Sequence, residues 1–403
     1  MLRMIRFELK KMYSNSVVIG SLAVLLLVCF LILQAYCFNN SATSAITPDG
    51  TQLSGREAIL FNQSIAEKYT GDFTDDTIAK MVLDYSTDYP AEYAETVERG
   101  AINALVPTSY LYLAMFIPPA NYDDLAQDAI SHGTSIPPLT EAGLVSIRDY
   151  GTAYVDKPLQ YGYNDSWAYF FSGFCGPTIA IAFPALIVII LAVSAIFSSE
   201  YSTKMDALIL TTRYGKNRQI TAKLFAGMIF TTTTIGGLFL LFCAAFGVQY
   251  GVPGWNADIQ ANLGLSLMGV NLPLNNLQLI LFGLGIVWLA GIFAAAVTAM
   301  ISAVTKTPFS SLVAAFAVFM APWIIRQVLP EGALRDRLIV FPANAVNAHE
   351  VLRMPVDVQS IFYNQPLAPA LCIAFATIIV SLISSATAHK AFRNHQSTGL
   401  TLM

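Results

Sequence analysis

The chain has 403 residues, of which 55% are hydrophobic and 12% are charged, and its formal net charge at pH 7 is -4. Because average soluble domains have about 25% charged residues, this composition excludes an ordinary soluble protein and indicates a polytopic membrane protein. The acidic balance gives no reason to expect a nucleic acid among its partners.

Six stretches are long and apolar enough to cross a bilayer, since about 20 helical residues span a hydrocarbon core of about 30 Å. They are residues 14–37, 173–198, 223–250, 277–303, 309–328 and 367–389, with charged side chains only at their ends. These stretches predict an all-α polytopic membrane protein with six transmembrane helices. Ion-driven transporters and pumps usually keep a charged group at membrane depth, so we expect the energy for any transport to enter from outside the membrane.

Residues 1–13 form a short amphipathic pattern before the first span. Apolar residues share one helical face and basic residues another, namely Leu2, Ile5, Leu9 and Met12 against Arg3, Arg6 and Lys10. This pattern predicts a helix at the membrane interface. Such a helix either only fixes the topology or also contacts a cytoplasmic partner.

The segment of residues 38–172 is long enough to fold as a separate domain. Ser54 and Glu57 have the spacing of a capping box and predict the start of one helix. Thr74, followed by two Asp residues, predicts the start of a second, and a third is expected over residues 91–105. These helix signals predict that residues 38–172 form a mainly helical extracellular domain. Its acidic residues do not match a calcium loop, and the five cysteines lie in or beside the spans, so we expect no metal site and no disulfide framework.

The distribution of basic residues predicts the orientation. With the N-terminus inside, the cytoplasmic pieces hold 12 basic and 3 acidic residues, and the outer pieces hold the other 10 and 23. The positive-inside rule then predicts a multi-pass protein of the cell (plasma) membrane with both termini in the cytoplasm. The predicted cytoplasmic pieces are a coupling loop at 199–222, a short loop at 304–308 and the tail at 390–403. The predicted extracellular pieces are 38–172, 251–276 and 329–366, the last with short interfacial helices.

The cytoplasmic loop of residues 199–222 is the most informative stretch. Residues 200–210 have helical spacing that clusters Met205, Leu208 and Ile209, and a turn follows. On the residues alone, such a helix suits either a docking surface for a cytoplasmic protein or a basic connector at the lipid head groups.

This loop resembles the signature region of permease subunits of type-2 ATP-binding-cassette (ABC) exporters. That region has a Glu at the inner end of span two, a short helix, a turn with an Arg, and a Lys that opens span three. The matching positions are Glu200, Leu208, Leu210, Thr211, Arg213, Gly215, Arg218 and Lys223. Residues 202–204 depart from the Gly-Thr that often follows the Glu in this family.

The resemblance implies a transmembrane permease subunit that moves a hydrophobic or amphipathic substrate out of the cell. The permease would pair with a second permease, as a homodimer or heterodimer, and with a separate cytoplasmic ABC ATPase that binds ATP and Mg²⁺. The expected ATPase-coupling residues are Glu200, Met205, Leu208, Ile209, Arg213, Gly215, Arg218 and Lys223.

No catalytic or cofactor-binding motif is expected in this chain. Gly215-Lys216-Asn217 lacks both the earlier glycine and the following Ser or Thr of a phosphate-binding loop. We therefore expect a chain that is not an enzyme, with membrane lipid as its other partner.

Two alternatives stay open. A mechanotransmission ABC permease acts on outer partners through a large extracellular domain, although such proteins typically have four spans. A ligand sensor would bind its ligand with the domain at residues 38–172. A neighbouring gene for an ABC ATPase would separate the permeases from the sensor.

Overall fold

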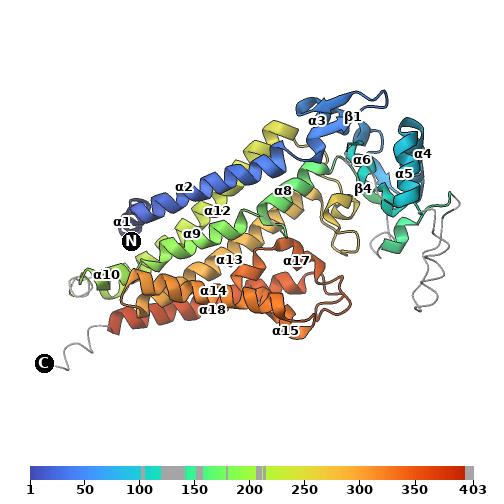
Figure 1. Ribbon diagram of the computed structural model, residues 1–403. Helices are drawn as coiled ribbons and strands as arrows, with labels where there is room; N and C mark the ends of the chain where they lie inside the picture. Colours follow the sequence, from blue (N-terminus) through green and yellow to red (C-terminus); the bar gives the residue numbers. More distant parts are fainter. Residues whose placement is uncertain are drawn as a thin grey trace. The chain divides into compact units, whose positions relative to one another are not determined.

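The computed structural model is almost entirely helical (Figure 1). It describes residues 1–100, 105–118, 140, 142–150, 158–177, 180–205, 211 and 215–394. The chain divides into two compact units. Unit 1 consists of Met1–Ile32, Ser172–Phe242 and Phe282–Met403, and unit 2 consists of Leu33–Phe171 and Cys243–Leu281.

Five helices in the described part of the chain are long and apolar enough to cross a membrane. They are α2 (Ser16–Leu33, continued by the π-turn Gln34–Phe38), α12 (Ile220–Tyr250), α13 (Asn276–Val304), α14 (Pro308–Val328) and α18 (Ala368–Asn394). They coincide with five of the six predicted spans. The multi-pass helical character predicted from the sequence is therefore supported.

The remaining predicted span, residues 173–198, is interrupted. Helix α8 (Asp165–Cys175) ends before Gly176 and Pro177, and α9 covers the 13 residues Ala182–Ser194. A Cβ at Gly176 would overlap the carbonyl oxygen of Ser172, and proline disfavours helical geometry at the residue before it. At 1.5 Å per residue α9 is about 20 Å long, so it is shorter than the hydrocarbon core of a bilayer. A sixth continuous helix of spanning length is not among the described elements.

The N-terminal helix and the connector before α18 follow the predicted pattern. Helix α1 runs from Leu2 to Tyr13, as expected for residues 1–13. Between α14 and α18, the chain forms α15 (Ala333–Arg337), the 3-10 helix Leu338–Val340, α16 (Pro342–Ala345) and α17 (Ala348–Arg353). The short helices expected within residues 329–366 are therefore present.

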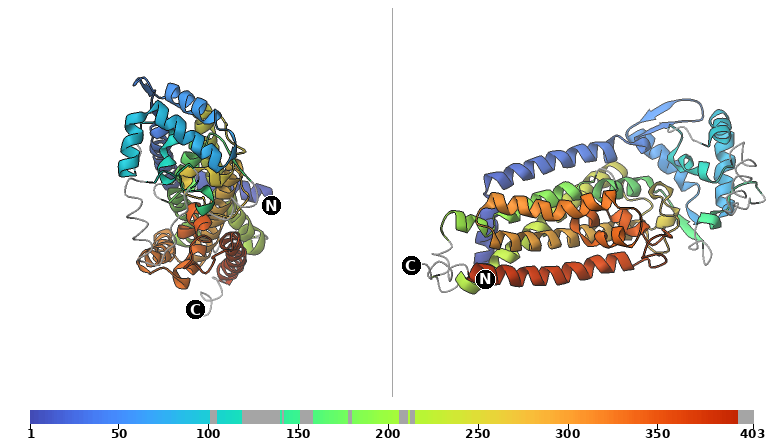
Figure 2. Two further views of the ribbon diagram at one scale, coloured as in Figure 1. Left: turned by 90° about the vertical axis from the view of Figure 1, so that its right-hand side faces the viewer. Right: turned by 60° about the horizontal axis from the view of Figure 1, so that its bottom comes forward.

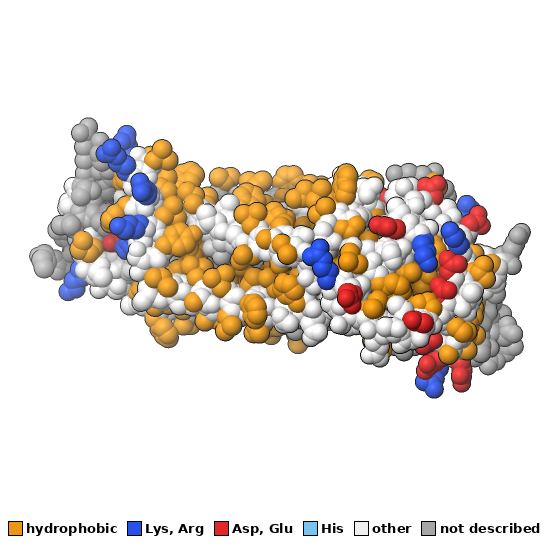
Figure 3. All heavy atoms as spheres, turned by 90° about the horizontal axis from the view of Figure 1, so that it is seen from above, with side chains coloured by type: hydrophobic (Ala, Val, Ile, Leu, Met, Phe, Trp, Pro, Cys, Tyr) orange, Lys and Arg blue, Asp and Glu red, His pale blue; other side chains and the backbone are white. Residues whose placement is uncertain are grey.

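The long helices expose apolar side chains. Leu26 on α2, Leu240 on α12 and Leu382 on α18 are each more than half exposed. Hydrophobic side chains also gather along the long helices on the face seen in Figure 3. In unit 1, α14 and α18 extend in a similar direction in the right-hand view of Figure 2. Apolar side chains that are exposed together along long helices are typical of a surface that meets lipid.

Unit 2 is mainly helical in its described residues but also has short strands. Its helices are α3 (Arg56–Glu67), α4 (Asp75–Asp88), α5 (Pro90–Arg99) and α6 (Thr108–Leu111). The strands form two antiparallel pairs, β1 (Ser44–Ile46) with β2 (Gln52–Ser54) and β3 (Gly71–Phe73) with β4 (Leu159–Tyr161). Short 3-10 helices complete the unit at Ser41–Thr43, Leu113–Met115, Ile147–Tyr150, Ile259–Ala261 and Leu263–Leu265.

The helix starts predicted in this region have different outcomes. The hydroxyl of Thr74 accepts a hydrogen bond from the Thr77 N–H and caps α4, as predicted. The predicted capping box at Ser54 is wrong, because Ser54 ends β2 and the N-cap of α3 is Gly55, which has a φ of 59° and no side-chain cap. Helix α5 ends at Arg99, before the expected residue 105, because Gly100 adopts the left-handed conformation that closes helices.

Candidate functional site

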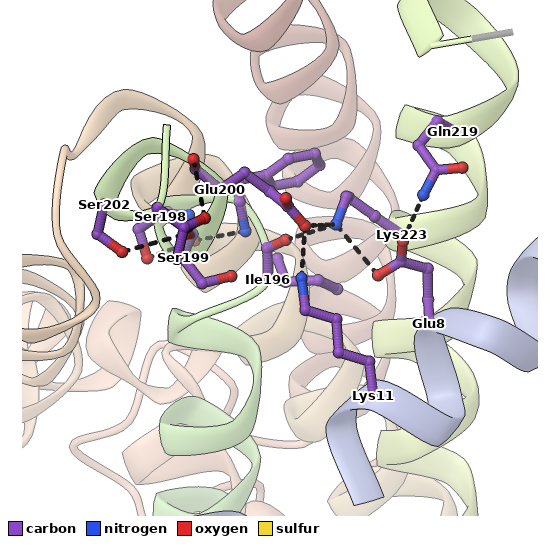
Figure 4. Close-up of polar contacts among 12 residues, drawn as sticks. Glu8, Lys11, Ile196, Ser198, Ser199, Glu200, Ser202, Gln219 and Lys223 are labelled. Atoms are coloured by element: carbon purple, nitrogen blue, oxygen red, sulfur yellow. Dashed lines mark hydrogen bonds and ion pairs between the residues drawn. The ribbon is translucent and has the colours of Figure 1, made fainter. Parts of the chain in front are cut away.

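Lys223, in the first turn of α12, lies at the centre of a buried ionic cluster in unit 1 (Figure 4). Its side chain is 0% exposed. Its Nζ donates to Glu8 Oε2 at 3.1 Å, to Glu200 Oε1 at 2.9 Å and to the Ile196 carbonyl oxygen at 3.1 Å. A lysine ammonium has three donors, so all of them are satisfied.

The two carboxylates of this cluster also have second partners. Gln219 Nε2 donates to the other oxygen of Glu8, and Lys11 Nζ donates to Glu200 Oε1. Glu8 is 2% exposed and Glu200 is 5% exposed. The cluster of Glu8, Lys11, Glu200, Gln219 and Lys223 therefore balances two buried carboxylates with the buried Lys223 and with Lys11, whose side chain is 45% exposed.

The sequence brings these side chains together from three segments. Glu8 and Lys11 are three residues apart on α1, so they lie on adjacent positions of one helix face. Glu200 lies in the short helix α10 (Ser198–Ser202). Gln219 precedes Lys223 by four residues, and this spacing is one helical turn.

Helix α10 is fixed at its start by Ser302 on α13. The Phe197 and Ser198 N–H groups both donate to Ser302 Oγ at 3.0 Å, and Ser302 Oγ donates to the Ser194 carbonyl oxygen at 2.7 Å. The Tyr201 hydroxyl donates to the Ala303 carbonyl oxygen at 2.8 Å. The position of Glu200 is therefore set by hydrogen bonds on both sides of it in the sequence.

The electrostatics of the cluster keep Glu200 ionised. Burial acts to raise the pKa of Glu200, but Lys223 and Lys11 outweigh it, so that this pKa lies below its usual value. Lys223 Nζ also lies 5.9 Å from the centre of the Phe197 ring, within the range of a cation–π contact.

Three of the predicted coupling residues are not among the five members of the cluster. Met205, just after α10, is 45% exposed. Gly215 begins the π-turn Gly215–Gln219, in which Arg218 is exposed. Glu200 and Lys223 are the two predicted residues that the structure brings together. Leu208, Ile209 and Arg213 lie outside the described residues.

Sequence reasoning missed Glu8, Lys11 and Gln219. One signal was available, because Glu8 is the single acidic residue among the first 13 and lies at helical spacing from Ile5 and Met12 on the predicted apolar face. A lone acid on such a face indicates a buried partner. That the partner would be Lys223 could not be read from the spacing.

The cluster has the composition of a structural contact that holds helices together. It consists of ion pairs and an amide, with no nucleophile aimed at an open cavity. Within the described part of the chain, no group of three or more His, Cys, Asp or Glu side chains could hold a metal ion. The ion pairs connect α1, α10 and α12, so that none of the three can move far without breaking a buried charge pair.

Comparisons of the chain with known protein families, with curated proteins and with solved structures find no match.

Proposed function

We propose that this chain is the transmembrane permease subunit of an ATP-driven ABC exporter of the type-2 kind. It would move a hydrophobic or amphipathic substrate out of the cell, together with a second permease. A separate cytoplasmic subunit would bind ATP and Mg²⁺ and hydrolyse the ATP. The observation that carries this proposal is the buried cluster around Lys223, because it joins the segment expected to receive the ATPase to a membrane helix.

The cluster supports a route for energy coupling. A partner that pushes on the loop of residues 199–222 displaces α10 and with it Glu200. Because Glu200 is paired with Lys223 and Lys11, this displacement must either carry α12 and α1 along or separate buried charges. Leaving one buried charge unpaired costs about 3–5 kcal/mol. Joint movement is therefore the favoured response.

The exposed residues of the same segment provide the contact surface in this proposal. Met205 supplies apolar area and Arg218 supplies charge, both accessible to a partner. Glu200 has a different role, since its carboxylate faces the interior and acts as a positioning group for α10.

A second candidate function rests on unit 2, which forms a compact body of its own. A mechanotransmission permease or a ligand sensor would act through such a body. These candidates share the orientation of the exporter and differ in what unit 2 contacts.

The orientation is testable by labelling introduced cysteines from outside the cell. We expect reaction at Asp76→Cys, on an exposed position of α4, and protection at Asn217→Cys, on an exposed position of the π-turn before α12. The reverse pattern would contradict both the orientation and the coupling route.

The decisive experiment asks whether a neighbouring gene encodes an ABC ATPase and whether that ATPase co-purifies with this chain. We expect the ATPase to copurify with the wild-type chain and Arg218→Glu to weaken the association by about 30-fold, the effect of roughly 2 kcal/mol at a charged interface. Asp76→Lys, an exposed change in unit 2, should leave recovery unchanged. Absence of the ATPase from the wild-type preparation, or equal recovery with Arg218→Glu, would defeat the proposal.

The role of Glu200 gives a separate readout. Glu200→Gln should retain the ATPase but lose the stimulation of ATP hydrolysis by the permease, because the loop still docks while its link to Lys223 is weakened. A docking role for Glu200 would instead reduce recovery of the ATPase.

A further inference from the structure

Unit 1 contains a cavity of about 560 Å³ apart from the Lys223 cluster. Its walls come from the break between α8 and α9, the first turn of α9, the last turns of α14, and α16 with the residues after it. Pro177, Phe183, Trp323, Arg326, Asn344 and Val346 are among the lining residues. Sites for small molecules usually measure about 300–1,000 Å³, so the cavity is large enough for an organic ligand.

One part of the cavity wall is aromatic and apolar. The rings of Phe183 and Trp323 lie 5.9 Å apart at an angle of 48°. Pro177 and Val346 add further apolar surface. This part suits the apolar or aromatic body of a ligand.

The other part of the wall carries a single formal charge among the described lining residues, that of Arg326. Arg326 is 7% exposed. Its Nη2 donates to Glu350 Oε1 at 2.8 Å and its Nε donates to the Arg335 carbonyl oxygen at 3.4 Å. Because a guanidinium has five N–H donors, these two bonds leave donors for an acidic group in the cavity.

Asn344 supplies an independent sign of a ligand. It is 3% exposed, and its Nδ2 donates to the Leu338 carbonyl oxygen at 2.8 Å. Its Oδ1 is buried and has no hydrogen-bond partner among the described residues. Buried polar atoms in native structures normally have a partner. Asn344 lines the cavity, so a rotation of its side chain would bring this oxygen to an O–H or N–H of a bound molecule.

We infer that this cavity binds an amphipathic anion. Its apolar or aromatic body lies against Phe183 and Trp323, and its acidic head group accepts hydrogen bonds from Arg326. An O–H or N–H next to the acid donates to Asn344 Oδ1. The site does not depend on an ATPase partner, so the inference stands or falls apart from the proposed function.

The test uses the purified full-length chain in phosphatidylcholine nanodiscs, with no ATPase present. The probe is dansylglycine, which has an aromatic body, an N–H and a carboxylate, and its neutral amide, dansylglycinamide, is the matched comparison. Binding is followed by dansyl fluorescence, with empty nanodiscs as the background. We expect saturable binding of dansylglycine that is at least tenfold tighter than binding of the amide.

Three variants assign the binding to the cavity. Arg326→Gln with Glu350→Gln removes the cation without leaving a lone charge and should abolish the preference for the carboxylate. Asn344→Leu keeps the ion pair and should weaken binding of both probes. Ala180→Trp fills the cavity from its lining and should abolish binding of both. Arg353→Gln, an exposed change on α17, should bind like the wild type.

The inference is overturned if the wild-type chain shows no saturable binding above empty nanodiscs, or if the amide binds as tightly as the acid. Wild-type binding by both Ala180→Trp and Asn344→Leu would also overturn it. This outcome counts even if the double variant Arg326→Gln with Glu350→Gln fails to fold. A last arm identifies the natural source of the anion. Displacement of the probe by phosphatidylglycerol in the nanodisc assigns the head group to a membrane lipid, and unchanged binding assigns the site to a free amphiphile.

Discussion

Two carboxylates, one in each unit, are held in opposite ways. In unit 1, the cations Lys223 and Lys11 outweigh the effect of burial and keep the pKa of Glu200 below its usual value. In unit 2, Asp165 accepts a hydrogen bond from the neutral hydroxyl of Thr108, and burial raises its pKa from 3.8 to about 6. The difference shows that the charge of the partner, together with burial, decides the direction in which the pKa of a carboxyl group shifts in this protein.

The buried polar groups around these carboxylates differ in the same way. Unit 1 uses ion pairs, whereas unit 2 uses neutral amides. Asn276 Nδ2 donates to Asn164 Oδ1 at 2.8 Å, and Asn262 Nδ2 donates to Asn276 Oδ1 at 3.0 Å. Removing one ion leaves buried charge behind, and removing one amide leaves only dipoles. We therefore expect unit 1 to be the more sensitive of the two to a single substitution.

The largest effect is expected for Lys223→Met. This change leaves the buried carboxylate of Glu8 without a cation and leaves Glu200 with only one of its two cations. It should therefore lower the free energy of unfolding by about 3–5 kcal/mol. Thermal unfolding of the detergent-purified protein, followed by intrinsic fluorescence, measures the loss as a lower Tm.

The matched control is Lys68→Met, which removes an exposed lysine from unit 2. It should change Tm little, because exposed charges contribute little to stability. Equal effects of the two changes would show that the charges around Lys223 are solvated, and would remove the contrast between the units.

A smaller loss is expected for Asn276→Ala in unit 2. The change removes the donor to Asn164 Oδ1 and to the Gly254 carbonyl oxygen, at 2.8 and 3.0 Å. The Gly254 carbonyl oxygen keeps the Ala257 N–H at 3.1 Å, and Asn262 Nδ2 keeps the Asn164 carbonyl oxygen at 3.3 Å. Asn164 Oδ1 is therefore the one of these groups that loses its partner, at a cost of about 1–3 kcal/mol. The Tm of this variant should therefore fall by less than that of Lys223→Met, and the opposite ranking would mean that the neutral amides stabilise the protein more than the ion pairs.

The sequence was sufficient for the long helices because length and hydropathy alone define them. It was not sufficient for the interruption near residue 176, since Gly176 and Pro177 break a helix without adding a charge to the apolar stretch that contains them. The strands β1 to β4 have three residues each, which is too short for an alternating pattern to be recognised.

Two of the five residues of the cluster were predictable, for a similar reason. Glu200 and Lys223 stand out because they flank one loop, 23 residues apart. The contact of Lys223 with Glu8 joins positions 215 residues apart and depends on how α1 packs beside α12. Packing of this kind has no local signature, so the spacing within residues 1–13 predicted a helix but not its buried carboxylate.

The smallest expected effect is a pH dependence that the two carboxylates produce with opposite signs. The folded-state pKa of Asp165 is raised above the unfolded value of 3.8 to about 6. Between these two pH values the folded state therefore binds more protons than the unfolded state. Its contribution to stability is full below pH 3.8 and is lost as the pH rises through about 6. At about 1.4 kcal/mol per pKa unit, the loss between pH 5 and 7 is about 1 kcal/mol. Glu200, with its lowered pKa, stabilises above its unfolded value and loses that contribution as the pH falls.

Asp165→Asn removes the contribution of Asp165 to the pH dependence of stability, because an amide keeps an oxygen for the Thr108 hydroxyl but does not titrate. Chemical unfolding of both proteins at several pH values between 5 and 7 gives the comparison. The stability of the wild type relative to Asp165→Asn should fall as the pH rises across this range. A difference that stays constant, or grows with pH, would mean that Asp165 is ionised throughout and that unit 2 holds its carboxylate as unit 1 does.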